Sequence, residues 1–335
     1  MAAEVHHGPL DFEAIAREWV RHVRGRRSQI AFSRRLGYRS SVVHRWETGA
    51  ASPTAAAFLR ACALTGKDLA GALTTFFDRR PVWLAQHGPA SREGVAALLR
   101  QLRGNIRIGV LANASGYSRY RVARWLHGEA QPRLPEFLRL VEASSRRCLD
   151  LIATLHDPAK LPSASASWLR LQRMREAAYQ EMWSHAVLRA LELSAYSGGP
   201  NDTDWLAGVL GISSAQVERA LSALVRTGQI QRTGDRWTAL PATAVTTGRD
   251  PATAGVLTRA WTAVAQERLE RKSAGLFGYS LFSISRADLR RLRDLQLSYL
   301  REMQTIIAGS EPNECVGLLC LQLLDLSEQP HNALG

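Results

Sequence analysis

Residues 37–53 read GYRSSVVHRWETGAASP, and residues 116–132 read GYSRYRVARWLHGEAQP. At an offset of 79 the two stretches agree at eight of seventeen positions, and the pairs Arg45-Trp46 and Arg124-Trp125 fall together. Self-similarity at a fixed offset is typical of one structural unit built twice. The chain of 335 residues is long enough for both units and for further domains.

Each copy is predicted to be a small all-helical module. In the first copy, Gly37 and Gly49 are expected to end two short helices, because glycine readily takes the left-handed conformation found there. Pro53 is expected to start the next helix. The first helix of this copy is predicted to begin at the N-cap Asp11 and to bury residues at helical spacing: Phe12, Ile15, Ala16, Trp19, Val20 and Val23.

The positive charge of the chain coincides with the repeat. The net charge is +13, and residues 1–160 hold 25 Lys and Arg against 13 Asp and Glu, whereas the remainder holds 18 against 17. A solvated basic face would not predict this coincidence. A polyanionic partner would, because Lys and Arg contact phosphates.

Two short helices joined through Gly37 form a predicted helix-turn-helix, and its context resembles the Cro/C1 phage-repressor type, also called lambda-repressor-like. The resemblance covers about residues 12–77 and 91–155. It rests on Gln29 opening the second helix, on inward-facing Val43 and Trp46, and on Glu47 followed by Gly49 and Pro53. The second copy departs from the pattern, because Ile108 replaces Gln29 and Leu126 replaces Glu47.

The resemblance implies that the third helix of each copy enters the major groove of duplex DNA. Trp46 and Trp125 are expected to lie in the cores, with Arg45 and Arg124 on the opposite face, where arginine can read guanine. A plain phosphate contact or a surface charge is the alternative for each arginine. Gln29 is expected to contact phosphate or sugar. The implied DNA contacts are Gln29, Arg39, Ser40, Ser41, His44 and Arg45 in the first copy, and Arg107, Ser118, Arg119, Tyr120, Arg121 and Arg124 in the second.

The second half of the chain follows a different plan. Ser213 and Gln216 form a predicted capping box that begins a helix, and residues 229–240 are a predicted hairpin, which together suggest a winged helix. Its role is expected to be structural or protein-binding, with DNA contact by the wing as the alternative. Residues 276–285 and 315–327 are predicted strands on either side of a helix, a β-α-β unit.

The predicted fold is therefore mostly α, with a small α+β unit at the C-terminus. The predicted domains are two helix-turn-helix units at 1–80 and 81–157, a linker at 158–167, a long helix and winged helix at 168–244, and the α+β unit at 245–335. The second half is similar to a bacterial transcriptional regulator family whose tandem helix-turn-helix (XRE-like) domains precede a domain of unknown function. Residues 280–327 carry that resemblance, which implies a cytoplasmic regulator.

Other classes of function lack support in the sequence. No apolar run reaches the length of a membrane helix, and the first residues lack the pattern of a signal peptide. The four cysteines show no metal-ligand spacing, and no phosphate loop or nucleophile elbow is present. We expect no enzyme activity, no cofactor and no metal.

The expected function is sequence-specific binding of double-stranded DNA by a transcriptional repressor or activator that dimerises through its C-terminal half. Both units of one chain would then follow one groove, and four recognition helices per homodimer would read a long inverted repeat. Two alternatives remain open. One is an antitoxin-like or defence-linked autoregulator whose C-terminal half binds a partner protein or effector, and the other is a non-specific nucleic-acid-binding scaffold.

Overall fold

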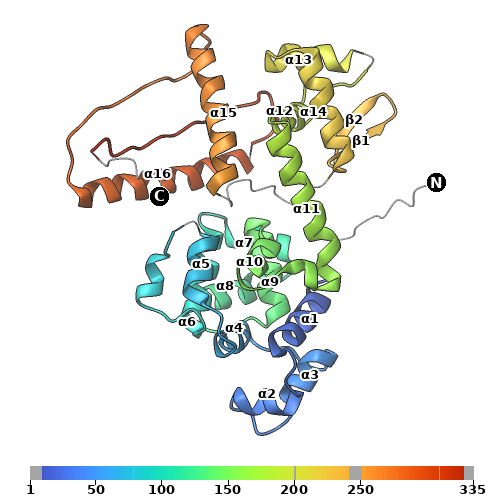
Figure 1. The fold of residues 1–335 in the computed structure, drawn as a ribbon, viewed down its shortest axis with the longest axis vertical. Helices are drawn as coiled ribbons and strands as arrows, with labels where there is room; N and C mark the ends of the chain where they lie inside the picture. The colour runs from blue at the N-terminus through green and yellow to red at the C-terminus, as the bar shows by residue number, and fades with distance from the viewer. Residues whose placement is uncertain (1–9, 78, 200, 241–250, 309, 328–335) are drawn as a thin grey trace, which may run out of the picture. The chain divides into compact units, whose positions relative to one another are not determined.

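The computed structural model describes residues 10–77, 79–199, 201–240, 251–308 and 310–327. Within these ranges the chain is mostly helical and divides into two compact units, each described by itself below (Figure 1). The N-terminal unit comprises residues 10–176, and the C-terminal unit comprises the described residues from 177 onward.

The N-terminal unit contains the two copies of the repeated sequence, hereafter the first and second repeats. The helices of the first repeat are α1 (Phe12–Arg24), α2 (Gln29–Arg35), α3 (Val42–Thr48), α4 (Ala55–Leu64) and α5 (Leu69–Phe76). A short 3₁₀ helix, η1 (Val82–Ala85), precedes the second repeat. Its helices are α6 (Arg92–Arg103), α7 (Ile108–Ser115), α8 (Arg119–His127), α9 (Leu134–Ser145) and α10 (Cys148–Leu155).

The helix ends show why the two repeats fold alike. The carboxylate of Asp11 accepts a hydrogen bond from the backbone N–H of Ala14 at 2.9 Å, as expected of an N-cap. Gly49 and Gly128 occupy equivalent positions after α3 and α8, with φ of +83° and +74°. A residue with a Cβ is disfavoured in this conformation, so glycine ends both helices at the same place.

Pro53 does not start α4, contrary to the sequence-based expectation. The N-cap is Thr54, whose hydroxyl accepts a hydrogen bond from Ala57 N at 3.2 Å. Pro53 lies one residue before this N-cap, and its carbonyl accepts a hydrogen bond from Leu134 N in the second repeat, at 2.8 Å.

One hydrophobic core serves both repeats. All six residues predicted to face inward on α1 are buried, and they belong to a single cluster of buried side chains that includes both α4 and α9. Trp19, Phe58 and Phe137 are among the largest fully buried side chains. The two repeats therefore form one folded body.

Residues 158–167 differ from the expected linker. They form a 3₁₀ turn, η2 (Pro158–Lys160), and the start of helix α11 (Pro162–Gln180). Leu161 and Ala164 are buried in the core of the N-terminal unit. The carboxylate of Glu18 on α1 accepts hydrogen bonds from Ser163, at 2.9 Å from the backbone N–H and 2.7 Å from the hydroxyl. These long-range contacts order a segment whose composition suggests a loop.

The C-terminal unit begins within α11 and contains the expected winged-helix order. The predicted long helix ends at Gln180, and a new helix follows. The elements are α12 (Trp183–Ala190), α13 (Asp202–Leu210), α14 (Ser214–Arg226) and an antiparallel hairpin of β1 (Ile230–Thr233) and β2 (Arg236–Ala239). Ser213 and Gln216 form the predicted capping box at the start of α14.

The predicted β-α-β unit is absent from the described residues. Helices α15 (Pro251–Glu270) and α16 (Arg286–Ala308) are present, but residues 276–285 and 315–327 form no strands in this part of the structure. These segments remain extended on either side of α16 (Figure 1). Their apolar side chains lie largely exposed, including Leu281, Leu324 and Leu326. An apolar run predicts a strand, but pairing also needs a second strand in reach.

Candidate nucleic-acid interface

The two predicted recognition helices, α3 and α8, are held by the same aromatic pair. Trp46 and Trp125 are buried, at 5% and 3% exposed, which confirms that both are core residues. The ring of Tyr38 meets Trp46 edge-on with centroids 5.6 Å apart, and Tyr117 meets Trp125 in the same way at 5.1 Å. Each pair fixes the helix-turn-helix by packing the turn residue against the helix that follows it.

A second equivalent contact ties each recognition helix to the first helix of its repeat. Arg21 donates a hydrogen bond from Nη2 to the carbonyl of Glu47 at 2.8 Å. Arg100, at the equivalent position, donates from Nη1 to the carbonyl of Leu126 at 2.7 Å. Because both bonds reach the residue after the tryptophan, they hold the C-terminal ends of α3 and α8 alike.

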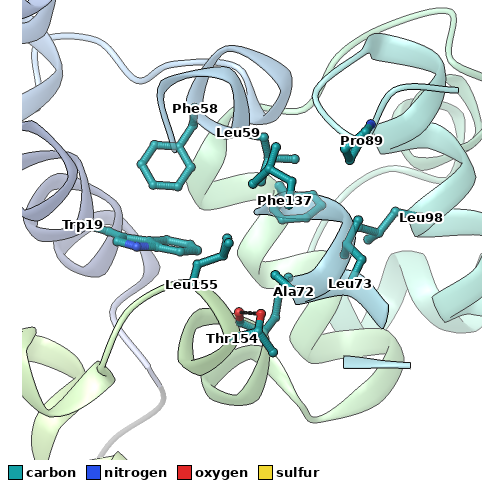
Figure 2. Close-up of a pocket in the computed structure, with 12 residues that line it drawn as sticks. Trp19, Phe58, Leu59, Ala72, Leu73, Pro89, Leu98, Phe137, Thr154 and Leu155 are labelled. Carbon is teal, nitrogen blue, oxygen red and sulfur yellow. Dashed lines mark hydrogen bonds between the residues drawn. The ribbon is translucent and has the colours of Figure 1, made fainter. Parts of the chain in front are cut away.

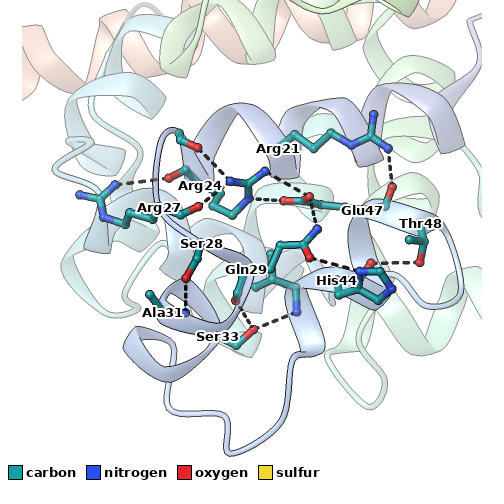
Figure 3. A network of polar contacts seen from close by, with 12 residues as sticks. Arg21, Arg24, Arg27, Ser28, Gln29, Ala31, Ser33, His44, Glu47 and Thr48 are labelled. Carbon is teal, nitrogen blue, oxygen red and sulfur yellow. Dashed lines mark hydrogen bonds and ion pairs between the residues drawn. The ribbon is translucent and has the colours of Figure 1, made fainter.

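In the first repeat a buried carboxylate joins three helices (Figure 3). Glu47 is 3% exposed and pairs with Arg24, whose Nε lies 2.5 Å from Oε1. Gln29 donates from Nε2 to the other carboxylate oxygen of Glu47 at 2.7 Å, and its Oε1 lies 3.2 Å from Nδ1 of His44. The sequence-based expectation for Gln29 is a contact with phosphate or sugar. In the structure its amide holds α2 to α3.

The second repeat replaces this polar network with apolar contacts. Leu126 is 1% exposed, and Ile108 is half-buried against the same core. Arg103, equivalent to Arg24, keeps a buried Nε that has no hydrogen-bond partner within the described residues. At the residue after the tryptophan, α3 is therefore held by hydrogen bonds and an ion pair of Glu47, whereas α8 is held by apolar packing of Leu126.

The outward surface of α3 and of the turn before it is polar, and His44 on this surface contacts Gln29. Arg39, Ser40, His44 and Arg45 are exposed, and Ser41 at the N-cap is half-buried. The guanidinium of Arg45 has no hydrogen bond or ion pair to any described residue. The structure therefore leaves these predicted residues at or near the surface, whereas the neighbouring Trp46 is buried.

The outward face of α8 is more basic, and part of it is engaged. Ser118, Arg119 and Tyr120 at the start of α8 are exposed, and the predicted contact Arg107 is exposed at the N-cap of α7. Arg121 forms an ion pair with Glu136, and its guanidinium lies 4.9 Å from the ring centre of Trp125. Arg124 stacks over Tyr120 at 5.7 Å and lies 3.7 Å from a carboxylate oxygen of Glu129. These two arginines remain near solvent and also pair with the carboxylates of Glu136 and Glu129.

An open groove beside α8 adds residues that sequence reasoning missed. It is lined by Ser118, Tyr120, Arg121 and Arg124, together with Arg133 and Glu136. Arg133 is exposed and donates to the carbonyl of Ser52 at 2.5 Å. In the sequence, Arg133 and Glu136 are marked only by their place just after the repeated motif.

The arginines of the winged helix are also partly engaged. Arg232 stacks on Trp237 at 5.4 Å, Arg236 stacks on Tyr196 at 5.2 Å, and Arg219 pairs with Glu181 at 3.2 Å. Both arginines of the hairpin, Arg232 and Arg236, therefore contact aromatic rings.

Comparison with known proteins concerns the second half of the chain. Residues 163–326 match a family described as a domain of unknown function, DUF4423. The match covers just under half of the chain and begins one residue after the start of α11. No curated protein matches the chain. No solved structure matches it either.

The described residues contain neither a candidate membrane span nor a candidate metal cluster. No helix there is both long and apolar enough to cross a membrane. No cluster of three His, Cys, Asp or Glu side chains suited to a metal ion occurs among them. Burial raises the pKa of the Cys62 thiol to about 12 and also raises the pKa of Cys148, so both thiols stay protonated.

Proposed function

We propose that this chain is a sequence-specific, double-stranded DNA-binding transcriptional regulator of the cytoplasm. Helices α3 and α8 would each enter a major groove, with Arg45 and Arg124 reading base edges and the neighbouring exposed residues contacting bases or phosphates.

The observation that supports this proposal most strongly is the duplicated scaffold around the tryptophans. In both repeats a buried Trp, an edge-on Tyr and an arginine bond to the helix backbone fix one short helix. The arginine before each Trp lies on the outward side of that helix. The basic excess of residues 1–160 supports a phosphate-bearing partner for this surface.

The test is a footprint on the DNA upstream of the protein's own gene, repeated across a salt series with random duplex as competitor. A protected sequence that outcompetes random DNA would support the proposal. Uniform protection that disappears with salt would leave only an electrostatic interaction and would contradict it.

Arginine variants sharpen this test. Arg45→Ala and Arg124→Ala should each relax sequence preference more than they lower affinity for random DNA. Arg173→Ala removes an exposed arginine from α11 and is the matched control, since it lies outside both recognition helices. Equal losses on every duplex would identify Arg45 and Arg124 as phosphate contacts.

A specific observation also favours protein binding by the C-terminal unit. Exposed apolar side chains gather on the two extended segments, with Leu276 and Tyr279 on one and Leu324 and Leu326 on the other. Exposed apolar patches are typical of protein interfaces. The proposed occupant is a second copy of this chain, whose extended segments could pair with these through their backbones. This homodimer and the DNA-binding function are separate claims.

A further inference from the structure

The two repeats contact each other through equivalent residues. Thr54 and Arg133, which are 79 positions apart, form an antiparallel β-bridge. Ala55 N donates to Pro132 O at 2.9 Å, and Leu134 N donates to Pro53 O at 2.8 Å. The two bonds are equivalent, because at the offset of 79 the donor Ala55 corresponds to the donor Leu134 and the acceptor Pro53 corresponds to the acceptor Pro132.

Helix packing follows the same rule. Helix α4 contacts its own counterpart α9, and α5 contacts its own counterpart α10. A further pair of contacts between the repeats is reciprocal, because α1 packs on α9 while α6 packs on α4. Such self-complementary contacts occur only around a two-fold axis, since repeats arranged head to tail would join two different surfaces.

The core between the repeats obeys this symmetry as well. Trp19 and Leu98 are equivalent residues, as are Phe58 and Phe137, and all four line one small apolar gap (Figure 2). All four are at most 2% exposed. The axis therefore passes through a packed core, which holds the repeats in one relative orientation.

An approximate two-fold axis constrains the recognition helices. Rotation by 180° leaves the height of each atom along the axis unchanged and reverses directions across it. Under this symmetry, α3 and α8 would lie at the same height along the axis and on opposite sides of it, and the components of their directions that lie across the axis would be opposed. B-DNA has two-fold axes perpendicular to its length, so a body of this symmetry matches an inverted repeat in the duplex.

We propose that one chain recognises a whole inverted repeat, with α3 on one half-site and α8 on the other. This inference rests on the proposed DNA-binding function. It replaces the sequence-based expectation that both units of one chain follow the same half-site. The half-site centres would lie about 10 base pairs apart, or a multiple of that distance.

The two half-sites are unequal, because the recognition faces differ. Arg45 and Arg124 are equivalent, so both half-sites should share a guanine at that position. Ser40 is replaced by Arg119 and Ser41 by Tyr120, so the flanking positions should differ. The α8 half-site should also contribute more to the salt dependence of binding.

The experiment selects preferred duplexes from a random library with the full-length chain. We expect an imperfect inverted repeat. Reversing one half-site to make a direct repeat should weaken binding by about 100-fold or more, since several base contacts are lost together. A direct repeat that binds as well as the selected site would overturn the inference.

Selection is then repeated with Arg45→Ala, Arg124→Ala and the control Arg173→Ala. Each recognition variant should relax one half-site only, and the two should relax opposite halves. This result does not depend on whether chains also dimerise. If either variant relaxed both halves equally, each half-site would be bound by a complete chain and the inference would be wrong.

Failure of the proposed function gives a different result. If the wild-type chain enriches no sequence, specific DNA recognition fails, and the inverted-repeat inference fails with it. An enriched site of the wrong symmetry, or variants that act on both halves, overturns only the inference.

Discussion

Trp19 donates a hydrogen bond from its indole Nε1 to Nδ1 of His156 at 2.8 Å, across 137 positions of sequence. Trp19 lies on α1 of the first repeat, and His156 directly follows α10 of the second. Both side chains are buried, and the acceptor role requires an unprotonated Nδ1. One neutral histidine therefore helps to hold the two repeats together.

This bond predicts that stability falls in acid. The pKa of His156 is lowered to about 3, mainly by burial and then by the nearby charges of Lys67 and His22. The pKa of His22 is also lowered, mainly by burial and then by Lys160 and Lys67, while Asp157 acts to raise it. The unfolded chain therefore binds more protons below about pH 6.5. The contribution of His156 is complete above that pH and is lost as the pH falls toward 3, at up to about 1.4 kcal/mol per pH unit.

Urea denaturation at several pH values measures this effect. His156→Gln keeps an acceptor for the indole N–H but does not titrate, so it should flatten the dependence of unfolding free energy on pH between 6.5 and 4. His127→Gln, on the exposed end of α8, is the control. An equally steep dependence in His156→Gln would assign the acid sensitivity to other groups.

Trp46→Ala should lower the free energy of unfolding of the N-terminal unit by about 3–5 kcal/mol, because it removes a buried aromatic side chain and leaves a cavity. Chemical denaturation followed by circular dichroism checks this. Tyr120→Ala removes an aromatic side chain that is 72% exposed and should change stability by less than about 0.5 kcal/mol. Equal effects of the two substitutions would contradict the core role of Trp46.

Glu47→Leu, which introduces the residue of the second repeat, should cost about 1.5–3 kcal/mol of stability. Arg24 and Gln29 would each lose an acceptor. A double-mutant cycle with Arg24→Ala should give a coupling energy of about 1–3 kcal/mol. Coupling near zero would show that Arg24 is satisfied by the carbonyls of Gly25 and Arg27 alone.

Truncation after Ser273 should abolish the proposed dimerisation and leave the winged helix folded. The shortened chain keeps α15, whose Trp261 packs on Trp183 with ring centroids 5.2 Å apart, and loses both exposed apolar segments. Sedimentation of the full-length and truncated chains would test this. A truncated chain that still dimerises would place the contact elsewhere.

Much of the candidate site was predictable because helices are local structures. The spacing of apolar residues identified α1, the recurring Gly-Tyr and Arg-Trp pairs identified α3 and α8, and all six inward positions on α1 were confirmed. The surroundings of Gln29 and Arg121 were not predictable. Their partners Glu47 and Glu136 lie 18 and 15 positions away, beyond the reach of helical periodicity.

The sequence by itself determined that one helical unit is built twice, with a tryptophan in each core and an arginine before it. Only the tertiary structure decided that the first and second repeats meet around a two-fold axis, that residues 162–167 are helical, and that residues 276–285 form no strand. The physical reason is the range of the contacts. Helix formation uses hydrogen bonds four residues apart, whereas the pairing of repeats and strands depends on which distant surfaces complement each other.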